Sequence, residues 1–216
     1  SLEQSPIVLL HDSLGCVELW RSFPTALCAA TQRTVVAYDR LGFGRSDARH
    51  DTLSLCFIDD EPAQGFSALR DALGIKRFIA LGHSVGGCMA VHCAGVYADE
   101  CDGLITISAQ AFNEARTRNG IVEAKGVFQA PEQLAKLEKY HGDKARWVLN
   151  AWTETWLNPA FENWSLTPAL AQVTCPSLVI HGEKDEYGSH RQPERMVRYI
   201  KGPAHGEMLA NIHHVP

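Results

Sequence analysis

The strongest chemical signal in the sequence is the segment Gly82-His83-Ser84-Val85-Gly86-Gly87. It directly follows the apolar run Phe78–Leu81 and precedes a stretch rich in small residues. A serine on a sharp turn from a strand into a helix takes strained backbone angles, and glycines two positions before and after it remove Cβ clashes. The amino end of the helix stabilises negative charge beside the hydroxyl. This pattern predicts that Ser84 is a nucleophile, with a structural glycine turn as the alternative.

A second segment supplies a candidate acid. Asp185 closes His181-Gly182-Glu183-Lys184-Asp185, which follows the apolar run Ser177–Ile180. In open α/β sheets, ligands bind at the carboxyl ends of the strands. A carboxylate there accepts a hydrogen bond from a histidine, fixes its tautomer and stabilises the imidazolium. The alternative is a solvated loop carboxylate. Other aspartates fall on expected helices or at their ends: Asp59, Asp60, Asp71, Asp99, Asp102 and Asp143.

Ten histidines compete for the role of general base. His205 precedes the last expected strand, which places it at the amino edge of the sheet, away from the candidate acid. His213 and His214 follow that strand and lie at the same edge as Asp185. His214 comes 29 residues after Asp185, which leaves room for a helix and a strand between them. The spacing alone leaves both terminal histidines as candidates.

Short apolar runs alternate with helical patterns along the chain. The runs are continuously apolar, as in a parallel sheet that is covered on both faces. This alternation predicts an α/β fold, with a mostly parallel sheet flanked by helices. Helices are expected at 17–30, at 57–73 with Gly74 as the stop, and at 85–98. The expected strands are Ile7–Leu10, Thr34–Tyr38, Arg77–Leu81, Leu104–Ile107, Ser177–Ile180 and Glu207–Ala210.

One long segment breaks this alternation. From about residue 111 to 171 the sequence shows helical periodicity and no strand signal, and Pro131 and Pro159 stand at or near expected helix boundaries. We interpret 111–171 as a helical cap inserted into a core formed by 1–110 and 172–216. Four of the five tryptophans fall in this cap, where they form either its core or a pocket wall: Trp147, Trp152, Trp156 and Trp164.

Taken in order, the motifs resemble those of the α/β-hydrolase family over nearly the whole chain. The segment His11-Asp12-Ser13-Leu14-Gly15 resembles the HGxxG oxyanion loop of that family. Residues 39–47, with the sequence DRLGFGRSD, resemble its D-x-x-G-x-G-x-S turn. Serine, aspartate and histidine follow one another in the order that this fold uses. The closest resemblance is to capped esterase-like and carbon–carbon-bond hydrolase-like members.

The resemblance implies which terminal histidine is the base. The family pattern G-H-x-P aligns with His213-His214-Val215-Pro216. His214 is then the general base, and His213 occupies the position of the family's glycine.

The resemblance also implies an oxyanion hole. It is expected to combine the backbone N–H of Val85 with one from the loop after His11, that of Ser13. Asp12 departs from the family, which has glycine at this position. A carboxylate near a developing oxyanion is unfavourable unless its side chain points away or binds an internal donor such as Arg40.

Together these residues predict acyl transfer to water. His214 removes the Ser84 proton as the hydroxyl attacks an ester-type carbonyl, and water then hydrolyses the acyl-enzyme. The aromatic-rich cap implies a small, mostly apolar substrate. A carbon–carbon-bond hydrolase or a cofactor-free perhydrolase would use the same triad, whereas serine excludes the dehalogenases and epoxide hydrolases that need aspartate. A ligand-binding receptor on this fold is the alternative from another class.

Bulk composition narrows the remaining classes. The net charge of −5 argues against a nucleic-acid partner, and no run approaches the roughly 18–20 apolar residues that span a bilayer. Gly42-Phe43-Gly44 lacks the third glycine of a dinucleotide site, and no metal-ligand spacing occurs, so no cofactor or metal is expected. The seven cysteines show no CxxC pair, which favours reduced thiols in a cytoplasmic protein.

The resemblance makes a prediction about the ends of the chain. Family members have one or two more strands before the position of Ser5 and a closing helix after that of Pro216. We therefore expect the chain to be part of a longer protein. The sequence opens without Met, which leaves room for a removed targeting segment.

Overall fold

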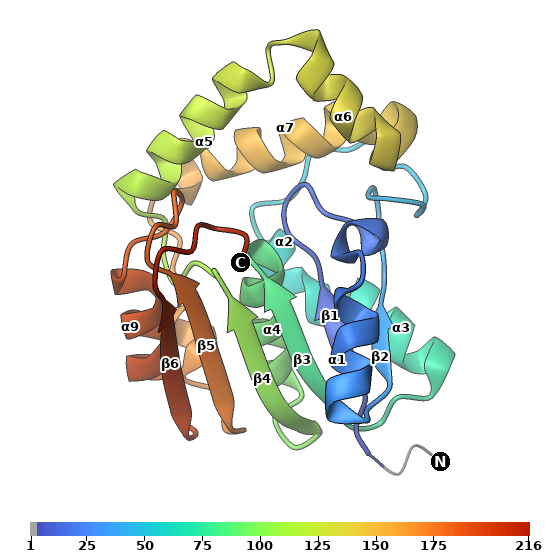
Figure 1. The fold of residues 1–216 in the computed structure, drawn as a ribbon, viewed down its shortest axis with the longest axis vertical. Coiled ribbons are helices and arrows are strands. Elements are labelled where there is room, and N and C mark those ends of the chain that lie inside the picture. Colours follow the sequence, from blue (N-terminus) through green and yellow to red (C-terminus); the bar gives the residue numbers. More distant parts are fainter. Residues whose placement is uncertain (1–3) are drawn as a thin grey trace.

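The computed structural model describes residues 4–216 and contains one sheet of six parallel strands. Across the sheet the order is β2-β1-β3-β4-β5-β6 (Figure 1). The chain goes from β1 to β2 at one edge and then builds the rest of the sheet on the other side of β1. This reversal puts the carboxyl ends of β1 and β3 side by side, at the switch point where α/β sheets bind ligands. The strands are β1 (Ile7–Leu10), β2 (Val35–Ala37), β3 (Phe78–His83), β4 (Cys101–Ile107), β5 (Ser177–Gly182) and β6 (Ala204–Leu209).

The apolar sequence of each inner strand matches its surroundings. All four residues of β1 are buried, because β1 pairs with β2 and β3 and is packed on both faces. Continuously apolar strands are what such a position requires. The predicted fold class, a parallel sheet flanked by helices, is confirmed. Strand ends differ by a few residues: β4 begins at Cys101, and β3 continues to His83. The last strand, β6, begins at Ala204, so the prediction that His205 precedes this strand was wrong.

One face of the sheet carries most of the hydrophobic core. Helix α4 (Val85–Val96) lies against β3 and β4, and α9 (Arg191–Tyr199) lies against β5 and β6 (Figure 1). The same cluster includes buried side chains from α2 (Phe57–Asp60), α3 (Gly65–Leu73) and α8 (Thr167–Leu170). Small residues dominate α4, so its backbone comes close to the strands.

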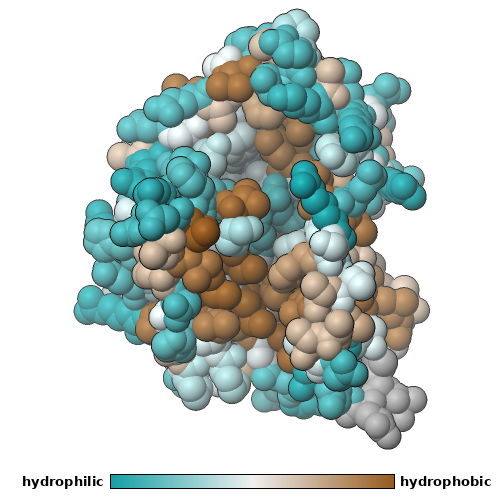
Figure 2. All heavy atoms as spheres, viewed as in Figure 1, coloured by the Kyte–Doolittle hydropathy of each residue, from teal (hydrophilic) through white to brown (hydrophobic). Residues whose placement is uncertain are grey.

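The opposite face is only partly covered within residues 4–216. Helix α1 (Phe23–Thr31) and the 3₁₀ helix η1 (Val17–Trp20) pack at the β1–β2 side of the sheet (Figure 1). Farther across, Ile79, Ile105 and Ile180 remain partly exposed on β3, β4 and β5. Figure 2 shows apolar side chains gathered over this face of the strands. We call the surface formed by these three isoleucines the open apolar face.

Two predicted helices are broken, and the prediction of continuous helices there was wrong. In the segment 17–30, η1 ends before Arg21, whose φ is 51°, and Pro24 lies in the first turn of α1. In the segment 57–73, the 3₁₀ helix η2 (Glu61–Ala63), which contains Pro62, separates α2 from α3. Proline is tolerated in the first turn of a helix but not in its interior, so both prolines mark new starts.

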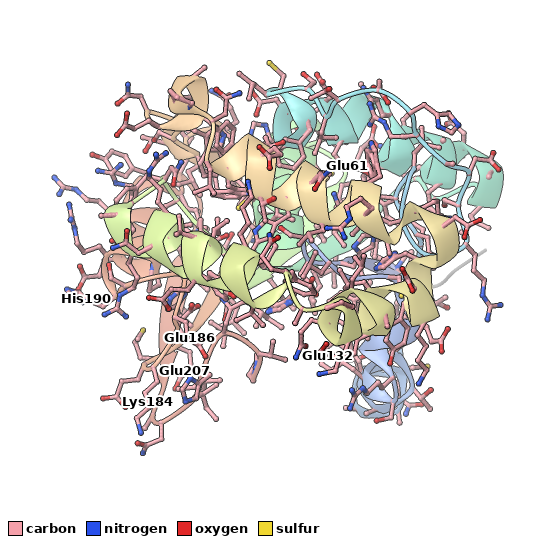
Figure 3. All side chains as sticks on the ribbon, turned by 90° about the horizontal axis from the view of Figure 1, so that it is seen from above. Glu61, Glu132, Lys184, Glu186, His190 and Glu207 are labelled. Atoms are coloured by element: carbon pink, nitrogen blue, oxygen red, sulfur yellow. The ribbon has the colours of Figure 1, made fainter. Side chains whose placement is uncertain are left out.

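Helices fill the long segment between β4 and β5. Figures 1 and 3 show α5 (Ala115–Val127), α6 (Pro131–His141) and α7 (Ala145–Trp156) crossing above the carboxyl ends of the strands. Pro131 starts α6, and Pro159 starts the 3₁₀ helix η4 (Pro159–Phe161), as predicted. The definition of 111–171 as a separate cap stays a prediction. In the described part of the chain, no helix has the length and apolar character needed to cross a membrane.

Candidate active site

Ser84 lies on a sharp turn between β3 and α4. Its φ is 54° and its ψ is −126°, a strained combination for a residue with a side chain. A Cβ on Gly82 would collide with the backbone of Gly86, and one on Gly86 would collide with the carbonyl of Leu10. The Ser84 amide donates to the carbonyl of Ile107 at 2.8 Å. Backbone packing therefore fixes the position of this serine, in the geometry that the sequence predicts.

Asp185 and His214 meet at the carboxyl edge of the sheet. The His214 Nδ1 lies 3.0 and 2.9 Å from the two carboxylate oxygens of Asp185. Asp185 is fully buried and also accepts hydrogen bonds from the amides of Tyr187, at 2.7 Å, and Gly188, at 3.0 Å. Burial opposes ionisation, but the hydrogen bond and charge of His214 outweigh it, so the pKa of Asp185 is lowered. The carboxylate therefore stays ionised and orients the His214 ring.

The structure separates the competing histidines. The side chain of His214 is 14% exposed and faces Asp185. The ring of His213 instead contacts the carboxylate of Glu186 at 2.8 Å and is 60% exposed. His205 lies in β6 beside Glu207 and is 73% exposed. Only His214 of these three reaches the predicted acid.

Ser84 and His214 share one pocket of about 200 Å³ beneath the helices above the sheet. No hydrogen bond joins the Ser84 hydroxyl to His214 in the described structure; catalytic hydrogen bonds are often loose before substrate binds. The His214 ring packs edge-on to Tyr187, with centroids 4.8 Å apart, and lies 5.1 Å from the ring of His83. The apolar part of the wall consists of Leu14, Ile121, Trp152, Trp156 and Val215.

The two predicted oxyanion donors lie close together. Ser13 and Val85 both line a small cavity that shares Trp152 and Trp156 with the main pocket. Within residues 4–216, no hydrogen bond uses the amide of Ser13 or Val85. Both N–H groups are therefore free to donate to a ligand, as an oxyanion hole requires. Their catalytic role stays a prediction.

The Asp12 side chain binds internal donors, but Arg40 is not one of them. Arg40 Nη2 donates to the backbone carbonyl of Asp12 at 2.8 Å. The carboxylate instead accepts from the amide of Leu14 at 2.9 Å and lies 3.4 Å from Nδ1 of His83. Burial raises the pKa of Asp12, but the contact with His83 more than reverses this and holds that pKa well below its ordinary value. Asp12 is thus a carboxylate on the wall of the pocket.

Sequence reasoning missed several residues that build this site. His83 and Glu186 both bind the backbone of His214: His83 Nε2 lies 2.9 Å from its carbonyl oxygen, and Glu186 accepts from its amide at 3.0 Å. In Figure 3, Glu186 lies toward the β5–β6 side of the molecule. Both partners are far from position 214 in the sequence, so no local pattern could have shown these contacts.

Helix α5 also holds the acid loop. Arg116 Nη1 donates to the carbonyl of Asp185 at 3.0 Å, and the Thr117 hydroxyl donates to the carbonyl of Tyr187 at 2.6 Å. The helices above the sheet therefore both roof the pocket and fix the loop that carries the acid. Across the described residues, no group of three or more His, Cys, Asp or Glu side chains is arranged to hold a metal ion.

The topology and the site together define a class. A parallel sheet with β1 and β3 at its switch point, a strained serine after β3 and an Asp–His pair at the same edge form the arrangement of α/β-hydrolase folds. The profile of the alpha/beta hydrolase fold family matches residues 5–209. The chain belongs to this family.

Curated relatives match half of the chain. The human protein named 1-acylglycerol-3-phosphate O-acyltransferase ABHD5 is 33% identical over 111 residues, which are 51% of this chain and 31% of that protein. The bovine protein named (Lyso)-N-acylphosphatidylethanolamine lipase is 33% identical over 110 residues, which are 51% of this chain and 32% of that protein. The matched stretch spans about a third of the length of these relatives.

Solved structures extend the similarity over the whole chain. A membrane phospholipase A, described as a bacterial virulence factor, has a TM-score of 0.78 at 20% identity and covers 100% of this chain and 74% of its own. A thermophilic esterase from Thermogutta terrifontis has a TM-score of 0.71 at 21% identity, with coverage of 98% and 83%. At these identities the similarity establishes the fold.

Proposed function

We propose that the protein is a serine hydrolase that cleaves a small, mostly apolar ester through an acyl-enzyme. His214 takes the proton of Ser84 as the hydroxyl attacks the carbonyl carbon. The oxyanion accepts hydrogen bonds from the amides of Val85 and Ser13, and His214 protonates the leaving alcohol. Water, activated by His214, then releases the acid. Asp185 holds the His214 ring and stabilises its charged form.

The observation that carries this proposal is the Asp185–His214 hydrogen bond at the rim of the pocket that contains Ser84. An imidazole held at Nδ1 by a buried carboxylate has its Nε2 available as a base. A serine held on a strained turn in the same pocket is the group that such a base activates. If the turn at Ser84 had only a structural role, the Asp185–His214 pair in the same pocket would have no explanation.

The proposed substrate class follows from the pocket wall. Most of the exposed surface of the pocket wall is apolar, and the cavity of about 200 Å³ suits a short acyl or alkyl group. The names of the two curated relatives, an acyltransferase and a lipase, both describe chemistry on acyl groups. These names support acyl chemistry at the proposed site and leave the acceptor, water or an alcohol, to be tested.

Hydrolysis of p-nitrophenyl acetate by the protein and by Ser84→Ala tests the proposal. We expect turnover by the unaltered protein and a loss of at least about 10³-fold in the variant, because the nucleophile is gone. Labelling with a fluorophosphonate should modify the peptide that contains Ser84. An ester series of increasing chain length should show the highest kcat/KM for short acyl groups.

The alternatives give different outcomes in the same assays. Undiminished turnover in Ser84→Ala would remove the central assignment. Tight binding of small apolar ligands without Ser84-dependent turnover would instead favour a receptor on this fold. Turnover of a vinylogous diketone with poor ester hydrolysis would favour a carbon–carbon-bond hydrolase, and peroxide-dependent product would favour a perhydrolase. Ester formation with an added alcohol would indicate acyl transfer.

A further inference from the structure

His83 stands between the nucleophile turn and two other parts of the site. It is the last residue of β3, directly before Ser84, and is 8% exposed. Its Nδ1 lies 3.4 Å from the Asp12 carboxylate in the loop after β1. Its Nε2 lies 2.9 Å from the carbonyl oxygen of His214. One side chain thus joins the oxyanion loop to the segment that carries the base.

The chemistry of these two partners fixes the protonation of His83. An ionised carboxylate and a backbone carbonyl are both acceptors, so each ring nitrogen must carry a proton in order to bind them. A neutral ring that donated to His214 would turn the lone pair of Nδ1 toward the Asp12 carboxylate. Only the imidazolium satisfies both contacts at once.

We infer that His83 is a positively charged positioning residue that neutralises Asp12 beside the oxyanion hole and holds the backbone of His214. The inference rests on the proposed function for its catalytic consequence. Asp12 occupies a position next to Ser13, whose amide is one of the proposed donors. Without a compensating cation, its negative charge would oppose the oxyanion that forms during attack, since two unit charges interact strongly in a partly desolvated site.

The surrounding charges agree with this assignment. Burial alone lowers the pKa of His83, but the contact with Asp12, the His214 carbonyl and the charge of Asp185 outweigh burial and raise that pKa above its ordinary value. The His214 imidazole also faces this ring, with the ring centroids 5.1 Å apart. A second cation at Arg40 binds the Asp12 carbonyl rather than its carboxylate, so His83 is the charged partner of that carboxylate.

A mutant cycle tests the charge compensation. His83→Gln keeps an N–H where Nε2 lies but removes the charge and the donor toward Asp12. We expect kcat for p-nitrophenyl acetate to fall by about 10-fold or more, because Asp12 is left uncompensated, with a smaller change in KM. Asp12→Asn alone should lower kcat less than His83→Gln does, because it removes the charge that His83 compensates. In Asp12→Asn/His83→Gln, kcat should return to within about threefold of Asp12→Asn.

A purely structural role for His83 gives a different result in this cycle. If the losses in kcat of the two single variants add in the double variant, or if the double variant loses more than His83→Gln, the proposed charge compensation is wrong. All rates are corrected with Ser84→Ala for background hydrolysis, and melting temperatures of the variants are compared to identify misfolded protein.

The ionisation of His83 can be measured without turnover. In protein labelled with ¹³C-histidine, the His83 resonance is the one lost in His83→Gln, and its titration reports the pKa directly. We expect that pKa to lie above its ordinary value of 6.5 and to fall in Asp12→Asn, because the contact with the carboxylate raises it. Titration below 6.5 would overturn the inference even in an active enzyme. Conversely, a raised pKa in a protein without Ser84-dependent turnover would refute the proposed function and leave the charged pair standing.

Discussion

The nucleophile and the base of the proposed site are held in different ways. Ser84 lies between a central strand and a buried helix, and glycine contacts and backbone hydrogen bonds define its position. His214 lies in a segment without regular secondary structure after β6. Three ionisable side chains hold it: Asp185 at the ring, Glu186 at the amide and His83 at the carbonyl.

This difference predicts two kinds of sensitivity. The serine turn depends on close backbone approach, so added atoms should damage it through steric collision, at any pH. The histidine segment depends on charged hydrogen-bond partners, so isosteric changes of charge should damage it while the fold persists. Substitutions that remove charge without changing shape therefore separate the two halves of the site.

The largest expected effect is that of Asp185→Asn on the base. The amide keeps the size of the carboxylate but no longer stabilises the His214 imidazolium, and its N–H₂ favours the wrong tautomer. We expect kcat to fall by about 10⁴-fold. Rates measured with p-nitrophenyl acetate, alongside circular dichroism, check this. A loss of less than tenfold in folded protein would show that Asp185 does not orient the base.

The serine turn should be most sensitive to a single methyl group. In Gly86→Ala the new Cβ would meet the carbonyls of Leu10 and His11, which are backbone atoms and cannot move aside cheaply. We expect the free energy of unfolding to fall by about 3 kcal/mol. We also expect esterase activity to be lost. The matched control is Gly126→Ala in α5, where nothing lies within 4 Å of the added Cβ.

The control should be neutral or stabilising by up to about 1 kcal/mol, because alanine is the better helix former. Urea unfolding of both variants measures the difference. Equal stability of the two variants would contradict the packing account of the turn.

The smallest expected effect is that of Glu186→Gln. The Glu186 carboxylate accepts from the amide of His214 and the ring of His213. Burial raises the pKa of Glu186, but hydrogen bonds from its own amide, the His214 amide and the His213 ring keep that pKa below its ordinary value. Glu186 is exposed, so water weakens its contribution. We expect kcat/KM to fall by about fivefold, mainly through kcat, because the base is less well positioned.

Glu183→Gln is the control for this change. Glu183 accepts from the amide of Asn211 at 2.9 Å, in the same terminal loop, but among the described residues its carboxylate makes no hydrogen bond to Ser84, Asp185 or His214. Its substitution should leave kcat/KM unchanged. Equal losses in both variants would show that general loop stability, rather than the contact with His214, sets the rate.

The parts of this molecule that could be predicted are those with a local sequence pattern or a fixed order of motifs along the chain. Five of the six strands follow from apolar runs, whereas β6 begins three residues before the expected strand and is exposed along most of its length. Ser84 follows from glycines at fixed offsets within one turn. Asp185 and the two terminal histidines could be placed because parallel strands end at one edge of the sheet, and the family resemblance then selected His214 over His213. The side-chain contacts of His83 with His214 join positions 131 apart and leave no pattern in the sequence. Glu186 could not be predicted because nothing in the sequence distinguishes it from other exposed loop carboxylates.

The broken helices show a different limit. Helical periodicity runs through 57–73, yet the proline of η2 divides the segment, and Gly65 lies so close to the Glu61 carboxylate that a side chain would crowd it. Periodicity reports which side of a segment is apolar, and it does not report where the axis changes direction. Turn signals inside an apolar pattern therefore deserve more weight than the pattern itself.

The open apolar face has a practical consequence for handling the protein. Ile79, Ile105 and Ile180 present partly exposed side chains on the same side of adjacent strands while the protein is native. Dyes such as anilinonaphthalene sulfonate fluoresce on surfaces of this kind, so a dye-based melting curve should start from a bright folded baseline. Sulfate salts strengthen apolar contacts, so they should also drive reversible clustering of the folded molecules.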